Sequence, residues 1–363
     1  MSSKKLTLIF KPITACNLRC KYCYAENPNS TEPVRFMSIE EMKKVFDWIA
    51  DYCLINQYKK ISIIWHGGEP LLIPVDVMET ILQYGESIFS AKGLKHKYLI
   101  QSNLVNISDE RVELIKRYFN NKIGGSLDVG TSTRIFPNGE NSKELVIKNI
   151  KSLKDAGVNV SVITMLTPEN IDHIKEIYNS FKEIGINFKS AAVFPTAFDK
   201  NVDVFSLTDK EYIKASIELF DLWFNDRDCN ISITNYLNMA TYLITNKAHS
   251  CSLSPSCQPD FLSIGCDGSL YPCGRFSGEK YSLGNIFSQS PEEFTKQSPQ
   301  LKLNADYPTP LACKKCKYYS ICHGPCLYER MVMPKPELCR TKALYSHIEM
   351  RLQEAGVNIK LSS

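Results

Sequence analysis

The sequence lacks any long apolar run. No segment approaches the roughly 18 consecutive apolar residues that a membrane-spanning helix needs, which excludes a helical integral membrane protein. The first residues, MSSKKLTLIFKP, contain a basic pair but neither the apolar stretch nor the cleavage site of a secretory signal. These absences predict a cytoplasmic protein with no membrane partner.

The sequence also lacks a strong excess of charge of either sign. Its 43 Lys and Arg and 39 Asp and Glu leave a net charge of +4, which is too small to indicate a nucleic-acid partner. Internal repeats and low-complexity tracts are missing as well. We therefore expect the 363 residues to fold as one large domain, or as a core domain with a smaller second one.

Cysteine, in contrast, is abundant, with 14 residues that are unevenly placed. Without a secretion signal these thiols are expected to stay reduced, so disulfides are not predicted. Three cysteines lie between positions 16 and 23, and nine lie between 251 and 339. Cys53 and Cys229 stand apart in apolar or helical surroundings and are expected to be buried structural thiols. The two dense groups are the candidates for metal or cluster binding.

The first two thirds of the chain alternate strand-like and helix-like segments. The strand-like segments are short and rich in Ile, Val, Tyr and Phe, as in parallel strands buried on both faces; they cover residues 6–10, 61–65, 97–101, 123–128, 158–166 and 188–194. Helical patterns lie between them, the first opened by a capping box of Ser38 and Glu41. Six such units, rather than eight, predict an α/β fold with a partial (β/α)6 TIM-like barrel.

Unusual polar segments accompany the ends of the first four predicted strands. The cysteine triplet follows the first strand, HGGEP (66–70) follows the second, QSN (101–103) the third, and SLD (126–128) ends the fourth. Because the carboxyl ends of the strands in a barrel-like sheet meet at one rim, these segments are expected to converge there. The sequence therefore places the chemistry at that rim.

The composition of the chain changes at Cys251. Pro, Gly, Ser and Cys dominate from there, and helical periodicity is absent until about Lys342. A segment of this composition cannot form a large apolar core, so metal sites are expected to replace one. The predicted division is 1–205 for the partial barrel, 206–250 for a helical connector, 251–345 for the cysteine-rich domain and 346–363 for a C-terminal helix and tail.

Cys16, Cys20 and Cys23 have the spacing C-x3-C-x2-C, with no fourth cysteine nearby. Structural zinc needs a closed set of four ligands, which His66 would have to complete. A 4Fe–4S cluster held by three thiolates instead leaves one iron open to an outside ligand, and the ferredoxin spacing C-x2-C-x2-C is different. We favour the cluster and keep zinc as the alternative.

This spacing, with the aromatic residue Tyr22 before the last cysteine, resembles the signature of the radical S-adenosylmethionine (SAM) enzymes. The resemblance implies that the open iron binds the methionyl amine and carboxylate of SAM, and that reductive cleavage yields a 5′-deoxyadenosyl radical. The protein would orient the cofactors and exclude water. The residues implied to contact SAM are Tyr22 at the adenine, Gly67, Gly68 and Glu69 at the amine, Gln101 from the strand-three motif, Ser126 and Asp128 near the ribose, and Arg134 at the carboxylate.

The later cysteines form two blocks, and one of them has the spacing C-x2-C-x5-C-x3-C, which alone also suits a zinc knuckle. Behind a radical SAM core, the blocks resemble the SPASM domain. The resemblance implies two auxiliary 4Fe–4S clusters, and hence three clusters in all. One would be held by Cys251, Cys257, Cys273 and Cys326, and the other by Cys313, Cys316, Cys322 and Cys339. Fully ligated clusters suit electron relay or structural support. Cys266 is left over, as a buried bystander or as a substrate-facing thiol or alternative ligand.

Proteins that this layout resembles mostly modify peptides or proteins; they include anaerobic sulfatase-maturating enzymes and ribosomal-peptide maturases. The sulfatase-maturating enzymes carry an aspartate base directly after the cysteine of YPC, where this sequence has Gly274. We therefore expect a ribosomal peptide as substrate and a thioether or other crosslink as product. Formylglycine formation and small-molecule oxidation are the alternatives.

The expected partners follow from the same resemblance. Only 15 residues precede Cys16, so an N-terminal leader-binding module is not expected. The barrel mouth or a separate leader-peptide-binding protein would recognise the substrate, and a flavodoxin or ferredoxin-type protein would reduce the cluster. A non-catalytic electron-transfer protein is the competing class, but it leaves the GGEP motif and the open-iron triplet unexplained.

Overall fold

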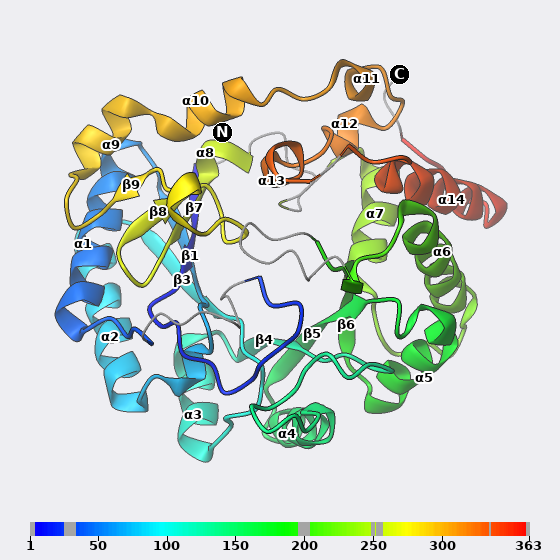
Figure 1. The fold of residues 1–363 in the computed structure, drawn as a ribbon, viewed down its shortest axis with the longest axis horizontal. Coiled ribbons are helices and arrows are strands. Elements are labelled where there is room, and N and C mark those ends of the chain that lie inside the picture. Colours follow the sequence, from blue (N-terminus) through cyan, green and yellow to red (C-terminus); the bar gives the residue numbers. More distant parts are fainter. Residues whose placement is uncertain are drawn as a thin grey trace. The chain divides into compact units, whose positions relative to one another are not determined.

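The computed structural model describes residues 4–24, 34–194, 204–247, 251, 257–333 and 335–360 (Figure 1). The chain divides into two compact units. The first comprises Met1–Ser126, Arg134–Val160 and Gln258–Ala305, and the second comprises Leu127–Thr133, Ser161–Cys257 and Asp306–Ser363. The first unit thus takes in part of the cysteine-rich segment, and the domain boundaries expected from the sequence stay a prediction.

The first unit is built on three neighbouring parallel strands, β1 (Lys5–Phe10), β2 (Lys60–Trp65) and β3 (Lys95–Ile100). A fourth strand, β4 (Lys122–Ser126), is bridged to the end of β3 through Gln101 and Gly124. The helices between them are α1 (Ile39–Ile55), α2 (Val75–Ala91), α3 (Asp109–Tyr118) and α4 (Lys143–Asp155), with the 3-10 turn η1 (Pro70–Leu72) after β2. Figure 1 shows α1, α2 and α3 along one side of these strands. The predicted strand ranges are confirmed to within two residues.

Helix α1 begins at the predicted capping box and fixes the strand ends. Ser38 N donates to Glu41 Oε2 at 2.8 Å, and Glu41 N donates to Ser38 Oγ at 3.2 Å. The buried face of the helix carries Phe46, whose ring meets Phe10 edge-on at 5.6 Å between centroids. Phe10 and Trp65 are the last residues of β1 and β2, and their rings lie 5.1 Å apart. This aromatic cluster fixes the ends of β1 and β2, after which the cysteine loop and the GGEP loop begin.

The start of the cysteine-rich segment extends the same sheet. After the short helix α8 (Cys257–Asp260), strand β7 (Phe261–Ile264) pairs in parallel with β1, and β8 (Ser269–Tyr271) and β9 (Gly284–Asn285) add antiparallel strands. The 3-10 turn η5 (Glu279–Tyr281) and helices α9 (Pro291–Gln297) and α10 (Pro299–Asp306) follow. The expectation that this segment lacks helices was wrong, because α9 is capped by Ser290 and anchored by one buried aromatic residue, Phe294, rather than by a long apolar stripe.

The second unit contains two parallel strands, β5 (Asn159–Leu166, from its third residue) and β6 (Asn187–Ala192). Its helices are η2 (Ile171–His173), α5 (Ile174–Ile184), α6 (Asp209–Asn225), α7 (Thr234–Thr245), α11 (Leu311–Lys314), α12 (Tyr319–Cys322), α13 (Leu327–Met331) and α14 (Arg340–Glu354). Asp221 of α6 accepts hydrogen bonds from His347 and Arg351 of α14, and Asp209 accepts from Arg340. These ion pairs tie the C-terminal helix to α6.

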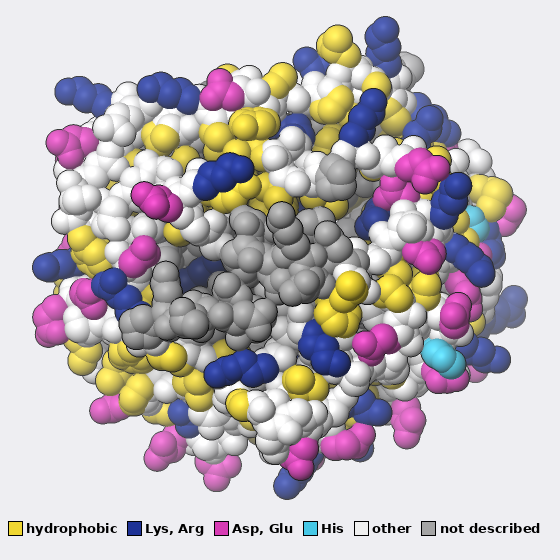
Figure 2. Space-filling view, in the orientation of Figure 1, with side chains coloured by type: hydrophobic (Ala, Val, Ile, Leu, Met, Phe, Trp, Pro, Cys, Tyr) yellow, Lys and Arg dark blue, Asp and Glu magenta, His cyan; other side chains and the backbone are white. Residues whose placement is uncertain are grey.

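Within the described ranges, no helix combines the length and the apolar character that a bilayer crossing would require. On the face shown in Figure 2, Lys and Arg side chains are interspersed with Asp and Glu. This mixture agrees with the small net charge of the sequence.

Candidate active site

The cysteine triplet lies in the loop that leaves β1. Cys23 N donates to Cys20 O at 3.1 Å, which closes a turn between the last two cysteines. The sulfur of Cys16 accepts from Leu18 N at 3.4 Å and from Asn103 Nδ2 at 3.6 Å. Burial raises the pKa of Cys16, and these two donors oppose that rise. Amide donors directed at a sulfur stabilise the thiolate, which is the form that ligates iron.

The two glycines of GGEP are required by the close approach of this loop. A Cβ at Gly68 would lie 2.2 Å from Ala15 O, and one at Gly67, where φ is +111°, would lie 2.3 Å from Ile13 O. Gly68 N and Glu69 N donate to Ile13 O and Ala15 O at 2.9 and 2.8 Å. The segment after β2 therefore holds the backbone directly before Cys16, which only glycine permits. A direct contact of these glycines with SAM stays a prediction.

The structure gives the zinc alternative no support. His66 Nδ1 accepts from Gly67 N at 2.8 Å, and Nε2 lies 3.2 Å from Tyr24 Oη, so both ring nitrogens have partners within the chain. Among the residues that the structure describes, no three His, Cys, Asp or Glu side chains are arranged to hold a single metal ion. A 4Fe–4S cluster spreads its thiolates over several irons, which suits three thiols in one loop with amide donors at one of them. The residues present therefore fit such a cluster, which would supply the electron that cleaves SAM.

Glu69 is the most completely held polar group of the site. Its side chain is 1% exposed and accepts from Leu71 N at 2.9 Å, Ser102 Oγ at 2.8 Å and Asn103 N at 2.6 Å. Burial raises its pKa, while these donors and the charge of Arg134 lower it. An ionised carboxylate has about four acceptor positions, so roughly one is left for a further donor. This is consistent with the predicted contact to the SAM ammonium group.

We expect Glu69→Gln to weaken SAM binding by tenfold or more, because a charge-assisted hydrogen bond contributes about 1.5–3 kcal/mol. The measurement is equilibrium binding of SAM to reconstituted enzyme, with iron content determined in parallel. Glu79→Gln is the matched control, since Glu79 accepts from Arg117 and Tyr118 on α3. Unchanged SAM affinity in Glu69→Gln with full iron content would contradict the assignment.

The remaining predicted SAM contacts fall into separate groups. Arg134 Nη1 donates to Tyr22 Oη at 3.4 Å, and the charge of Arg134 acts on Glu69, so these three side chains converge. Gln101 Nε2 donates to Gly125 O at 2.8 Å and lies 3.4 Å from Ser126 Oγ, which brings the strand-three and strand-four motifs together. Their contacts with SAM stay predictions.

Asp128 belongs to the second unit and is 4% exposed. Its carboxylate accepts from Met165 N at 2.8 Å, and Thr133 Oγ1 donates to it at 3.4 Å. These bonds fix the segment after β4 to the end of β5. The contact of Asp128 with the ribose stays a prediction.

Four cysteines of the second unit act on one another electrostatically. The pKa of Cys322 is raised to about 11, mainly by burial; a hydrogen bond with the Gly324 backbone opposes the rise, and Cys339, Cys313 and Cys316 add to it. Burial raises the pKa of Cys313 as well, followed by the effects of Cys339 and Cys316. Cys339 also caps α14, with Lys342 N 3.5 Å from its sulfur. These are the four residues expected to share one auxiliary cluster, and their mutual influence supports that assignment, which stays a prediction.

The other predicted ligand set is distributed over both units. Cys273 belongs to the first unit, Cys251 and Cys326 belong to the second, and the side chain of Cys257 lies outside the described residues. Cys266 is 5% exposed, and its thiol donates to Pro12 O at 3.1 Å. This placement agrees with the buried bystander role rather than with a thiol that faces a substrate.

Two residues of the site were given no role of their own from the sequence, although Asn103 belongs to the QSN segment that was expected at the rim. Asn103 contacts Cys16 and Asn17 through Nδ2, and it donates its backbone N–H to Glu69. Its place directly after Gln101 and Ser102 was the available signal. Tyr24, next to Cys23, contacts His66, and no local pattern distinguishes this tyrosine from a core residue.

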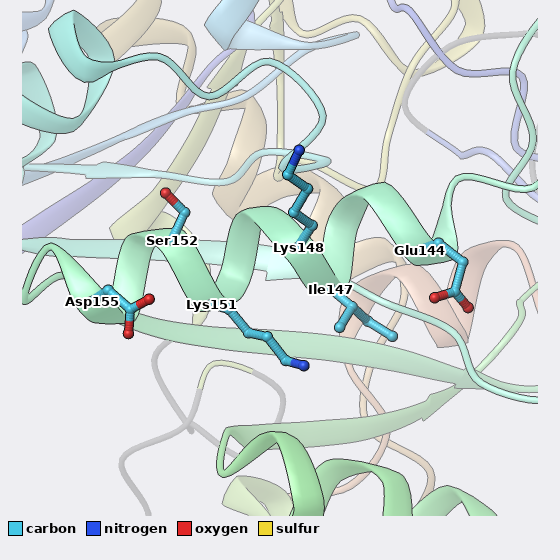
Figure 3. A pocket seen from close by; sticks show the side chains of 6 residues that line it. All are labelled: Glu144, Ile147, Lys148, Lys151, Ser152 and Asp155. Carbon is cyan, nitrogen blue, oxygen red and sulfur yellow. The ribbon is translucent and has the colours of Figure 1, made fainter.

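A surface pocket of about 510 Å³ lies elsewhere, along one face of α4 (Figure 3). It is lined by Glu144, Ile147, Lys148, Lys151, Ser152 and Asp155. None of the motif residues lines it, and its two acidic and two basic side chains all come from a single helix. It is therefore a groove on a charged helix face and not the site of the chemistry.

Comparison with known families identifies two domains in the chain. Residues 10–181 match the model of the radical SAM superfamily, and residues 256–317 match that of the SPASM iron–sulfur cluster-binding domain. The chain is 26% identical over 337 residues to a cysteine-type anaerobic sulfatase-maturating enzyme of Clostridium novyi, which covers 89% of this chain and 88% of the relative. A serine-type enzyme of Bacteroides thetaiotaomicron is 25% identical over 366 residues, covering 93% and 85%.

Solved structures agree in fold. Native anSMEcpe with bound AdoMet gives a TM-score of 0.80 at 23% identity, covering 98% of this chain and all of that one. Streptococcus suis SuiB bound to S-adenosylmethionine gives 0.59 at 18% identity, covering 92% and 75%. The expected α/β fold class with a SPASM domain is confirmed. A radical SAM domain uses SAM and a 4Fe–4S cluster, and a SPASM domain binds auxiliary clusters, so these are the cofactors of the protein. The chain is a radical SAM enzyme with a SPASM domain.

Proposed function

We propose that this enzyme removes a hydrogen atom from a residue of a ribosomally made peptide and forms a thioether or another crosslink. Peptide modification is supported by the relatives, which are described as sulfatase-maturating enzymes, and by the SuiB structure bound to its precursor peptide SuiA. The observation that favours a crosslink over formylglycine as the product is the glycine at position 274.

Gly274 stands where the sulfatase-maturating enzymes that the sequence resembles have an aspartate base. A glycine cannot accept a proton. A Cβ at this position would lie 3.2 Å from Cγ2 of Ile9, so the side chain of β1 occupies the space next to it. The residue that serves formylglycine formation in those enzymes is therefore missing here, together with part of the room for it.

Formylglycine formation is the second candidate. It is favoured by the alignment with cysteine-type maturating enzymes over most of both chains. The two candidates share the cysteine triplet and the SAM site, and they differ in the group that accepts the substrate proton.

The accessory partners belong to the same proposal. A flavodoxin or ferredoxin-type protein would supply the electron, and a separate leader-peptide-binding protein would present the substrate. A cytoplasmic location fits a chain with 14 cysteines, 11 of which are proposed to stay reduced and bind iron. In this proposal Cys16, Cys20 and Cys23 bind the cluster that cleaves SAM, and two sets of four cysteines bind the auxiliary clusters.

Mass spectrometry of peptides incubated with enzyme, SAM and reductant separates the candidates. A cysteine-containing peptide encoded next to the gene is expected to lose the mass of two hydrogen atoms and to become resistant to thiol alkylation. The matched peptide with serine in place of cysteine should stay unchanged if the bond is a thioether. Loss of two hydrogen atoms together with replacement of sulfur by oxygen in a sulfatase-derived peptide would instead establish formylglycine formation and overturn the first proposal.

A further inference from the structure

Seven exposed lysines gather at the amino-terminal ends of the strands of the first unit. Each is in β1, β2, β3 or β4 or directly precedes one of these strands; they are Lys4, Lys5, Lys59, Lys60, Lys95, Lys97 and Lys122. The register places Lys5 opposite Lys60 and Lys60 opposite Lys95, so three of them form a row across neighbouring strands. These seven, the amino-end lysines, lie at the opposite end of the strands from the cysteine loop.

The row lies on the face of the sheet that does not pack on the helices. Successive side chains of a strand point to opposite faces, and the ring of Tyr98 packs on Phe46 of α1 with 6.4 Å between centroids. Lys97 therefore points away from α1, and its register with the strand of Lys60 places both on one face. Burial lowers the pKa of Lys5, and the charges of Lys97 and Lys60 lower it further. The ammonium groups thus act on one another.

The charge of the amino-end lysines is not balanced. Within the described ranges of the chain, none of the seven ammonium groups forms an ion pair with a carboxylate. Like charges directly opposite one another on neighbouring strands destabilise a sheet. Lysines often protect an exposed sheet edge, but β2 lies between β1 and β3, so Lys60 is not at an edge. The fold therefore retains a repulsive group of charges for which the sheet itself has no use.

Helix α8 lies against the same end of the sheet. Tyr58, just before β2, has its Oη 3.2 Å from Pro259 O and 3.3 Å from Asp260 Oδ1. Nζ of Lys4 lies 4.2 Å from the centroid of the Tyr58 ring. Helix α8 begins at Cys257, one of the predicted ligands of an auxiliary cluster. The amino-end lysines are therefore next to a segment that is expected to hold that cluster.

The proposed crosslink requires an outside electron carrier. Cleavage of SAM consumes one electron, and the 5′-deoxyadenosyl radical then takes a hydrogen atom from carbon. When this carbon joins the thiol sulfur, the thiol hydrogen leaves as a proton and one electron is released. Electron relay is the role expected for the auxiliary clusters, so the released electron has to leave the enzyme from one of them. A surface beside such a cluster is a suitable place for the acceptor to bind.

We propose that the amino-end lysines dock an acidic one-electron carrier protein of the flavodoxin class, which exchanges electrons with the auxiliary cluster of Cys257. This proposal rests on the proposed function and adds the surface at which its redox partner binds. Complementary charges speed the encounter and orient the partner, and electron-transfer complexes are small and weak, which suits a group of exposed lysines. A peptide substrate fits this surface less well, because its modified residue has to reach the cysteine loop at the other end of the strands.

The test replaces Lys60, Lys95 and Lys97 together by glutamine and uses a purified flavodoxin of net negative charge as the probe. Reconstituted enzyme is reduced with dithionite, freed of excess reductant and mixed with oxidised flavodoxin. One electron leaves the enzyme and one enters the flavin, and the semiquinone is followed by its absorbance. We expect the second-order rate constant to fall about tenfold at low salt and to lose most of its dependence on salt, because exposed charges act mainly on association.

The matched control replaces Lys44, Lys148 and Lys151 by glutamine, which removes the same charge from exposed positions on α1 and α4. It should keep the wild-type rate of semiquinone formation. Iron content and SAM cleavage driven by dithionite, a small reductant that needs no docking surface, should be unchanged in both variants. Equal rates in the wild type and the Lys60, Lys95 and Lys97 variant would overturn the proposal, and so would an equal loss in the control.

Stability and substrate binding provide independent readouts. At low salt the melting temperature of the Lys60, Lys95 and Lys97 variant should equal or exceed that of the wild type, because repulsion across the strands is relieved. A lower melting temperature would mean that the lysines stabilise the sheet, against the proposal. Weaker binding of the peptide substrate with unchanged semiquinone formation would assign them to substrate recognition instead. Absence of 5′-deoxyadenosine from the wild type would reject the proposed function, whereas the flavodoxin measurement needs neither SAM nor peptide, which separates the two failures.

Discussion

Replacing Cys16, Cys20 and Cys23 together by alanine is expected to abolish release of 5′-deoxyadenosine and to leave about eight of about 12 irons bound, because a three-cluster enzyme would lose one 4Fe–4S cluster. The three thiols lie in one loop of the first unit, after β1. Four of the predicted auxiliary ligands lie in the second unit and act electrostatically on one another. Removal of the triplet should leave that group intact. Iron analysis of the reconstituted protein and chromatography of the SAM products measure the two effects.

Cys53→Ala is the matched control for this variant. Cys53 is fully buried in α1, and burial raises the pKa of its thiol to about 12, so it is expected neither to ligate iron nor to react. This variant should keep about 12 irons and full SAM cleavage. Loss of all iron from the triple variant would mean that the three sites do not assemble independently, and retained SAM cleavage would place the reactive cluster elsewhere.

The main sheet was predictable because its strands carry their own signal. A buried parallel strand is a short run of Ile, Val, Tyr and Phe, and the runs at 6–10 and 61–65 coincide with β1 and β2. The helix start at Ser38 was predictable for a similar local reason, since the capping box involves residues three positions apart. Both features depend on neighbours in the sequence and not on distant parts of the chain.

The pairing of β7 with β1 had no such signal. Thr7 is opposite Phe261 in the sheet, a pairing across most of the chain length. The four residues of β7 lie among Cys, Gly and Pro residues, a pattern that predicts a loop rather than a strand. Its side chains become core only because the open edge of β1 accepts it. Long-range strand pairing is decided by which edge is free, and periodicity does not contain that information.

The candidate site shows the same difference between features that local sequence predicts and features that depend on long-range contacts. The motif residues Glu69 and Gln101 were found because the GGEP and QSN segments resemble motifs of the radical SAM family, but their partners were not. That Glu69 would be held by Ser102 and the Asn103 backbone depends on how β2 and β3 end side by side. The His66–Tyr24 contact depends on a loop returning to the next strand end over 42 positions. Sequence therefore identified the groups that carry the chemistry, and the structure was needed for the groups that position them.

The second prediction concerns the cysteines after residue 251. A double variant, Cys316→Ala with Cys322→Ala, is expected to lose one auxiliary cluster, about four irons, while the SAM-binding cluster stays in place. Two remaining thiolates, Cys313 and Cys339, would be too few to hold a 4Fe–4S cluster. Because bound metal contributes to the stability of a segment with little apolar core, the melting temperature should fall as well. Iron analysis and thermal unfolding under anaerobic conditions measure both.

The matched control removes two thiols that are not expected to bind iron, in Cys53→Ala with Cys266→Ala. Cys266 donates a weak hydrogen bond to Pro12 O from a buried position between β7 and β8, and it is not among the predicted ligands. The control should retain about 12 irons. If it loses a cluster, Cys266 is a ligand and the assignment of two sets of four cysteines fails. If instead the Cys316 and Cys322 double variant keeps all its iron, the mutual influence of the four thiols in the second unit reflects proximity alone, and the cluster must be held by other residues.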